Sequence, residues 1–143
     1  MADRLRKLTP AVMREKTLES VRNHQETTVN MNTDQLFHGK LADGSDAPDY
    51  SQTSILKFGK RPGPWQFYGT GDFFRDFYIK AYRFPIVFDS RDLKVPLIFE
   101  AIEAKGLNPD EIFGLDKANR KDFARSYVLP DLQREIRQAI RVR

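Results

Sequence analysis

Two short runs of alternating apolar and polar residues constrain the fold of this chain most. Apolar side chains occupy every second position of residues 77–82 and again of residues 84–89, with a break near Arg83. A period of two predicts two antiparallel strands, one of them an edge strand or irregular at its start because Pro85 cannot donate a ladder hydrogen bond. Since an isolated hairpin is marginal in water, helices must cover one face. The predicted fold class is α+β: a small antiparallel sheet (hairpin or meander) packed against N-terminal, central and kinked C-terminal helices.

The first helix is expected to begin at Thr9 and Pro10. Thr can cap the free N–H groups, and Pro is tolerated at the first helical position. Apolar residues at helical spacing extend this helix to about Asn23. Residues 25–31 are ambiguous, because they include three consecutive β-branched residues, which lower helix propensity.

A short helix is predicted over residues 32–39. Asn32 or Thr33 could cap it, and Gly39 could end it in a left-handed conformation. Residues 50–58 have room for a further turn or two of helix.

The C-terminal half contains two more helix signals. Residues 90–92 turn the chain into a central helix with Pro96 near its start, and Gly106 is well placed to end it. The last element covers about residues 119–142, and Pro130 interrupts it. Because proline removes a backbone hydrogen bond and clashes with the preceding turn, we expect a kink or two helices that meet near residue 129.

The length of 143 residues is typical of one domain, so residues 1–143 are predicted to fold together. Residues 1–8 are expected to be flexible, and residues 40–50 and 58–66, which collect turn-forming residues, are expected to be loops. The chain has no cysteine, no apolar run near the ~20 residues that span a bilayer, and no apolar signal region at its start. These features predict a protein that works without disulfides and without a membrane partner, made in the cytoplasm.

Positive charge is concentrated at the C-terminus. The chain has a net charge of +4, and residues 117–143 alone hold eight basic residues against three acidic ones. Such a basic segment can contact nucleic acid, an acidic protein or only water.

The residues that could carry chemistry do not form an active-site motif. His24 and His38 are the only histidines, and the pair of His38 with Asp34 lacks the third ligand that a metal site needs. The carboxylates of residues 89–103 have basic neighbours and are interpreted as solvated charges, and neither glycine-rich segment, at residues 59–61 or 69–71, has the spacing of a phosphate-binding loop. We therefore expect no enzyme activity, no cofactor and no metal.

One loop mixes basic and aromatic side chains. Lys57, Lys60 and Arg61 precede Trp65, and Phe67 and Tyr68 follow it. This combination can bind single-stranded nucleic acid, or it can insert its aromatic rings into a neighbouring subunit. The subunit contact is favoured.

Several short motifs occur in an order that resembles a known family. Residues 32–36 read Asn-Thr-Asp-Gln-Leu and are followed by Gly39 and an Asp-Gly pair; residues 70–74 read Thr-Gly-Asp-Phe-Phe; residues 112–115 read Ile-Phe-Gly-Leu and precede the last helix. This order resembles the bacteriophage virion-morphogenesis or tail-completion family of the head–tail junction. Asp76, and residues 103–106 in place of a Lys-Tyr-Gly step, depart from that family's pattern.

The resemblance implies a structural protein of the virion, assembled in the host cytoplasm. It implies a homo-oligomeric ring in the neck that contacts portal or adaptor proteins above, or tail-tube proteins below, while genomic DNA passes through the lumen. An acidic patch around Asp43, Asp46 and Asp49 could meet a basic patch on the next copy. The residues predicted to form subunit interfaces are Trp65, Phe67, Tyr68, Arg134, Arg137 and Arg141.

Two other function classes compete with the virion protein. A basic nucleic-acid-binding module without catalytic activity would use the C-terminal arginines and would bind less tightly as salt rises. A small hydrolase is the least favoured, because it would depend on single acidic or histidine residues that no motif singles out.

Overall fold

The computed structural model describes residues 8–68 and 71–141 and has the predicted α+β fold. Its elements in chain order are α2 (Pro10–Asn23), α3 (Gln25–Phe37), α4 (Gln52–Phe58), α5 (Asp72–Arg75), β1 (Phe77–Lys80), β2 (Val87–Ser90), α6 (Val95–Ala104), the 3₁₀ turn η1 (Pro109–Glu111), α7 (Lys117–Phe123), the π-helical stretch η2 (Ala124–Val128) and α8 (Leu129–Ile140). Within the two described ranges, no helix is long and apolar enough to cross a membrane. The expected flexibility of residues 1–8 falls almost wholly on residues outside these ranges.

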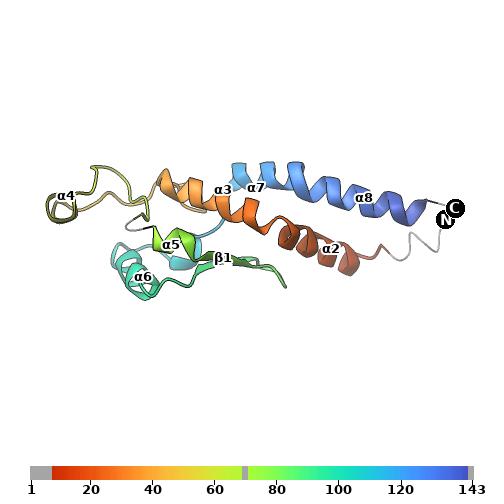
Figure 1. Cartoon of the computed structure of the whole chain (residues 1–143), viewed down its shortest axis with the longest axis horizontal. Helices are drawn as coiled ribbons and strands as arrows, with labels where there is room; N and C mark the ends of the chain where they lie inside the picture. The colour runs from red at the N-terminus through yellow and green to blue at the C-terminus, as the bar shows by residue number, and fades with distance from the viewer. Residues whose placement is uncertain (1–7, 69–70, 142–143) are drawn as a thin grey trace.

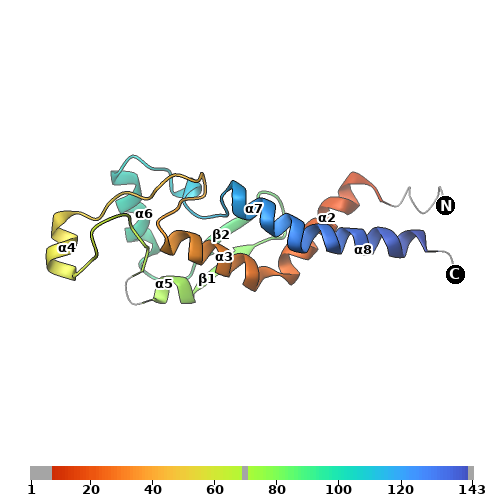
Figure 2. The same cartoon turned by 90° about the horizontal axis from the view of Figure 1, so that it is seen from above.

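The molecule is elongated (Figures 1 and 2). Helix α4 lies at one end, α2 and α8 extend toward the other, and the sheet, α5 and α6 lie between them. The whole chain exposes 9999 Å², whereas a compact monomer of this mass would expose roughly 7,600 Å². An excess of this kind leaves large side faces available for contact.

The predicted antiparallel pair is confirmed, with a later start for its second strand. β1 pairs with β2 in a register that sets Phe77 opposite Ser90 and Lys80 opposite Val87. In β1 the apolar residues at alternate positions are buried, as the pattern predicted. The second strand begins at Val87 and not at residue 84, since Pro85 has no N–H for the ladder.

Helix α3 differs from the prediction in both its start and its cap. It runs without interruption from Gln25 to Phe37, so the β-branched segment is helical and Asn32 and Thr33 are interior residues, not caps. Thr28 is accommodated by donating its hydroxyl hydrogen to the carbonyl of His24 (3.0 Å). The predicted left-handed Gly39 after the helix is confirmed, with φ +71°.

Asn32 is buried because it joins α3 to a distant segment. Its Nδ2 donates to the carbonyl of Gly114 (2.6 Å), and its Oδ1 accepts from the Gly114 N–H (3.2 Å). Gln35 adds a second donor to the same carbonyl (2.9 Å) and accepts from the N–H of Asp116 (2.9 Å). Together these hydrogen bonds, the amide clamp, satisfy the backbone of residues 114–116 inside the protein.

Aromatic rings fill the centre of the core. The centroid of the Phe73 ring lies 5.5 Å from those of Phe77 and Phe113. Leu36 of α3 and Ile102 of α6 are fully buried against this cluster. The offset and tilted ring arrangements are those that aromatic pairs favour.

A second cluster joins α2, β1 and α7, and consists of Val21, Ile79, Ala81, Leu115 and Phe123. Because Phe113 belongs to the first cluster and Leu115 to the second, residues 112–115 connect the two.

The C-terminal helical segment changes its hydrogen-bond pattern ahead of Pro130. α7 continues into the π-helical η2, and α8 begins at Leu129 with Pro130 in its first turn. Two helices therefore meet near residue 129, as expected from the missing proline N–H. The central helix α6 also matches, since Gly106 follows it with φ +73°.

Replacing Asn32 by Ala is expected to lower the free energy of unfolding by about 2 kcal/mol, because the buried Gly114 N–H loses its acceptor. Urea denaturation measures the change. Asn30→Ala is the matched control: Asn30 is exposed on the same helix, and its replacement brings the same gain in helix propensity. Equal stabilities of the two variants would contradict a structural role for the clamp.

Candidate functional site

The aromatic residues predicted to form an interface are divided between core and surface. Phe67 packs its ring against Phe73 and Phe113, with centroids 6.4 Å and 6.1 Å away, and Trp65 meets Phe67 edge to face at 6.2 Å. Tyr68 is half exposed. Of the three, Tyr68 is the most exposed, although its ring also meets that of Phe37 edge to face at 5.9 Å.

The loop is held in place by polar contacts with its own flanks. The Nζ of Lys60 donates to the carbonyl of Tyr68 (2.6 Å), and the hydroxyl of Tyr50 accepts from the N–H of Gln66 (3.1 Å). Phe67 has a φ of +53°, which is uncommon for a side chain other than glycine. The ring contacts of Phe67 stabilise this backbone geometry.

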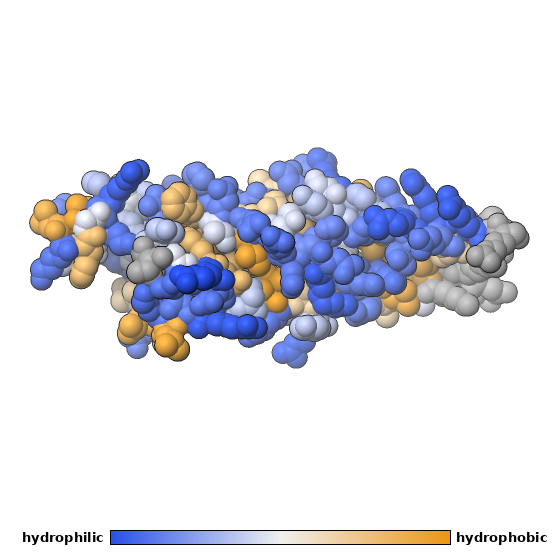
Figure 3. Space-filling view, viewed as in Figure 1, coloured by the Kyte–Doolittle hydropathy of each residue, from blue (hydrophilic) through white to orange (hydrophobic). Residues whose placement is uncertain are grey.

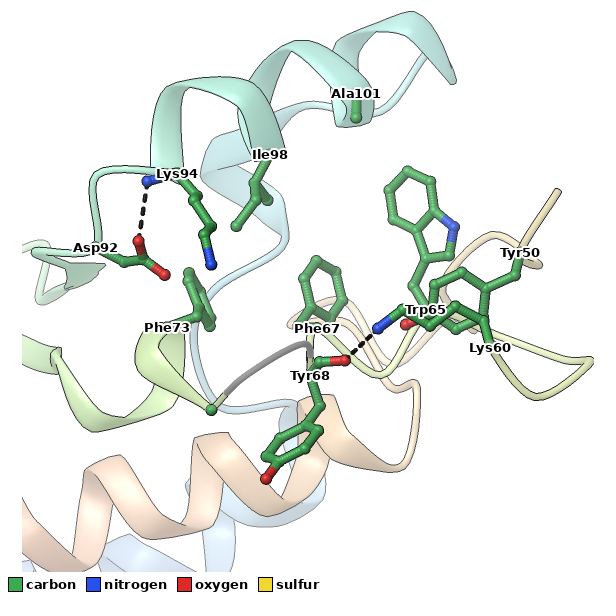
Figure 4. A pocket seen from close by; sticks show the side chains of 11 residues that line it. Tyr50, Lys60, Trp65, Phe67, Tyr68, Phe73, Asp92, Lys94, Ile98 and Ala101 are labelled. Carbon is green, nitrogen blue, oxygen red and sulfur yellow. Dashed lines mark hydrogen bonds between the residues drawn. The ribbon is translucent and has the colours of Figure 1, made fainter. Parts of the chain in front are cut away.

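A cavity of about 260 Å³ opens between this loop and α6 (Figure 4). Ile98 and Ala101 of α6 form one wall, and Trp65 and Phe67 form the other. Its polar lining includes Lys60, Asp92 and Lys94. The site is therefore an apolar slot with charges at its margin, suited to an aliphatic or aromatic group.

The three arginines predicted to form an interface lie together along α8 and at the residue that follows its end. Arg134, Arg137 and Arg141 line a common shallow groove with Pro130 and Gln133. They lie on the half of the molecule away from α4 and the aromatic loop (Figure 1), so the predicted interface residues belong to two separate surfaces.

Two members of the predicted acidic and basic patches pair with other residues in the part of the chain that the structure describes. Arg134 pairs with Asp131 (3.0 Å) and Lys40 pairs with Asp46 (2.6 Å). Asp43 accepts two hydrogen bonds from Ser45, which hold the pKa of Asp43 below its usual range. A contact between the two patches stays a prediction about different copies.

Ser20, His24 and Asp131 meet at the seam between α2 and α8, but not in the order of a catalytic triad. The Ser20 hydroxyl donates to Asp131 Oδ2 (2.7 Å), and His24 Nε2 lies 3.1 Å from the same oxygen. A nucleophilic serine needs its hydroxyl on the histidine, with the carboxylate on the other ring nitrogen. Here both groups bond the carboxylate, and Ser20 is buried, so the cluster ties the helices together.

The contact between α2 and α8 also contains charged side chains. Hydrogen bonds from Ser20 and then His24, with the nearby Arg134, hold the pKa of Asp131 below the ordinary aspartate value. Lys16 of α2 donates to Glu19 (2.9 Å) and lies 3.3 Å from Glu135 of α8, and these contacts raise the pKa of the lysine.

The remaining candidate residues are dispersed. His38 and Asp34 are 3.5 Å apart on an exposed surface, and within the described residues no three His, Cys, Asp or Glu side chains gather as metal ligands would. Asp89 contacts the hydroxyl of Tyr78 and the Nζ of Lys80, each at 3.2 Å. The first two residues of the 69–71 segment, and with them Thr70 of the family motif, lie outside the described ranges.

Four exposed apolar residues were missed by the sequence analysis. Leu56 and Phe58 of α4 are 81% and 71% exposed, and Leu93 and Leu97 at α6 are 94% and 65% exposed. The signal that could have found α4 is its isolation, since seven residues between two loops have few neighbours to cover them. For α6, the signal is that apolar residues occur on most sides of the helix, whereas packing against the core needs them on one side only.

No protein-family model, curated protein or solved structure matches this chain. The resemblance to the virion-morphogenesis family stays a prediction from the order of short motifs in the sequence.

Replacing Asp131 by Asn is expected to lower stability at pH 7 by about 1–2 kcal/mol, since charge-assisted hydrogen bonds are lost. Because the folded-state pKa of Asp131 is depressed, its contribution is present above the unfolded value and is lost as the pH falls through the folded one. The difference from the natural chain should therefore shrink between pH 5 and pH 2, as followed by thermal or urea unfolding.

Asp34→Asn is the control for this measurement, because the Asp34 side chain is 78% exposed and its pair with His38 is solvated. A pH-independent effect of Asp131→Asn would contradict the role of its ionised form.

Proposed function

We propose that this chain is a structural subunit of a bacteriophage virion at the head–tail junction, a neck or tail-completion protein that forms a ring around the passing DNA. It works through contacts with its own copies and with portal, adaptor or tail-tube proteins, and without bond-making chemistry. The proposal combines the order of family-like motifs with the character of the surface.

The observation that carries the proposal is the amount of apolar side chain left in solvent. Among the residues that the structure describes, eleven large hydrophobic side chains are exposed, and four of them are more than two-thirds exposed: Leu56, Phe58, Tyr82 and Leu93. Single exposed apolar residues are ordinary, but grouped ones mark contact surfaces. On an elongated chain of 143 residues they favour a subunit covered on several sides.

Two further features support a contact protein. The Ser20–His24–Asp131 cluster is arranged as a structural tie, which removes the best-placed candidate for a nucleophile. The Ile-Phe-Gly-Leu motif holds the two core clusters together, a role in the fold that a shared family scaffold would need.

The proposal predicts that the chain is a component of purified particles of the virus that encodes it. Mass spectrometry of gradient-purified particles should detect it together with the capsid and tail proteins, while a replication protein of the same virus serves as the absent control. Detection in the infected-cell lysate only, with none in the particles, would refute a virion role.

A second function is favoured by one specific observation, the grouping of the three arginines along α8. Arg134, Arg137 and Arg141 line one groove and could contact phosphates, with Arg134 also paired to Asp131 (3.0 Å). This is the basic nucleic-acid-binding module.

Reversing these three charges to Glu tests both functions. In the proposed ring the arginines meet the acidic patch of the next copy, so the triple variant should form no rings in negative-stain images. The control variant K105E/K121E/R125E changes the net charge equally at three other exposed positions. Rings in both samples would rule out the arginine contact.

A DNA-binding measurement distinguishes the nucleic-acid-binding module from the ring subunit. A module that neutralises three phosphates should lose roughly 40-fold in affinity between 50 and 200 mM salt, and the triple variant should lose that slope. Absence of binding by the natural chain at the lower salt concentration would dismiss the module.

A further inference from the structure

Helix α4 presents an apolar knob at one end of the molecule. Leu56 and Phe58 form this α4 knob, and neither belongs to a core cluster. The helix is firmly bounded: the Ser51 hydroxyl accepts from the N–H of Ser54 (3.1 Å), and Gly59 ends it with φ +63°. A short capped helix that holds two large apolar side chains in solvent is suited to packing into an apolar groove of another surface.

Helix α6 presents a matching apolar surface. Leu97 and Ala101 are both exposed and are four residues apart in α6, which places them on one side of the helix. Leu93, also exposed, lies in the turn two residues before the helix, and these three residues are called the apolar stripe. Ala101 also lines the cavity against Trp65 and Phe67. The stripe and the cavity therefore form one continuous apolar surface, the α6 groove.

The two surfaces cannot cover each other within one chain. α4 projects from the end of the molecule in both views, while α6 lies beside the sheet (Figures 1 and 2). Figure 3 shows the apolar side chains gathered at the tip and, separately, over α6. A knob and a groove at different places on one subunit are the elements of a head-to-tail contact.

We propose that the α4 knob of one copy docks in the α6 groove of the next copy. The charges are complementary along one edge of the groove, while Lys94 and Asp92 offset each other at the margin of the cavity. Lys57 and Arg61, both exposed, flank the knob, and no acidic residue occurs between residues 50 and 71. Glu100 and Glu103, also exposed, border the stripe on the side away from the cavity.

This contact deepens the proposed ring and rests on the chain assembling with itself. The knob fills the apolar slot between α6 and the aromatic loop, and the basic residues beside it reach the two glutamates. Because the contact is heterologous, an open chain of copies keeps a free knob at one end and a free groove at the other until a ring closes.

The absence of cysteine from the chain allows a direct test by disulfide trapping. Leu56→Cys and Leu97→Cys variants are mixed and oxidised with diamide, which takes up the two electrons and two protons released by the thiols. A mixed-disulfide dimer should form at least tenfold faster than in a mixture of Leu56→Cys with Leu129→Cys, the control, because Leu129 is an exposed leucine on α8. Equal rates in both mixtures would overturn the docking.

Charged substitutions make the direction of the contact visible. Leu56→Glu removes the knob and Leu97→Glu removes the groove, so each variant alone should sediment as a monomer. Their mixture retains one intact knob and one intact groove, and should stop at dimers. Assembly of either variant alone would overturn the head-to-tail contact.

The outcomes also separate this inference from the proposed function. If both variants form rings like the natural chain and the protein is found in particles, the docking fails and the virion role survives. If the natural chain is absent from particles yet the Leu56→Cys and Leu97→Cys variants give the specific disulfide, the contact survives and the virion role fails.

Discussion

The amide clamp between α3 and residues 114–116 is the constraint on which the rest of the structure depends. Asn32 and Gln35 satisfy both polar groups of the Gly114 backbone in the interior. This fixes the segment that supplies Phe113 to one core cluster and Leu115 to the other. Asp116 then caps α7 by accepting from the Asn119 N–H (2.8 Å). The position of the whole C-terminal helical segment follows from hydrogen bonds made at its first residues.

Features governed by neighbouring residues were predictable from the sequence. The Thr9 cap, the left-handed Gly39 and the break at Pro130 depend on backbone geometry within a few residues, and all three are present. The continuity of α3 was not predictable in this way. Asn32 suits a cap by local preference, but its partner lies 82 residues away, and burying two tertiary hydrogen bonds outweighs that preference. Propensity fails here because the deciding contact is distant.

The candidate surfaces also combine features that neighbouring residues determine with features that depend on distant contacts. Helical spacing was enough to place the α8 arginines on one face, and the structure groups them. Composition suggested an aromatic loop, but it could not reveal that Phe67 turns inward with a positive φ or that Lys60 and Tyr50 fasten the loop. The exposure of Leu56 and Leu97 could not be predicted from the sequence either, since burial depends on how the elements pack and not on the identity of the residue.

The elongated shape separates two kinds of surface that respond differently to their surroundings. Near α4 and α6 the exposed side chains are aliphatic and aromatic, so contacts there gain from removing apolar area from water and are nearly independent of salt. On α8 the exposed face is cationic, and contacts there are screened within about 8 Å at physiological ionic strength. In the proposed ring, the apolar end therefore provides the cohesion between copies, while the basic end sets their orientation and their response to the charge of DNA. A chain with one self-complementary surface could form a dimer, whereas a ring closed by head-to-tail contacts requires two different, complementary surfaces.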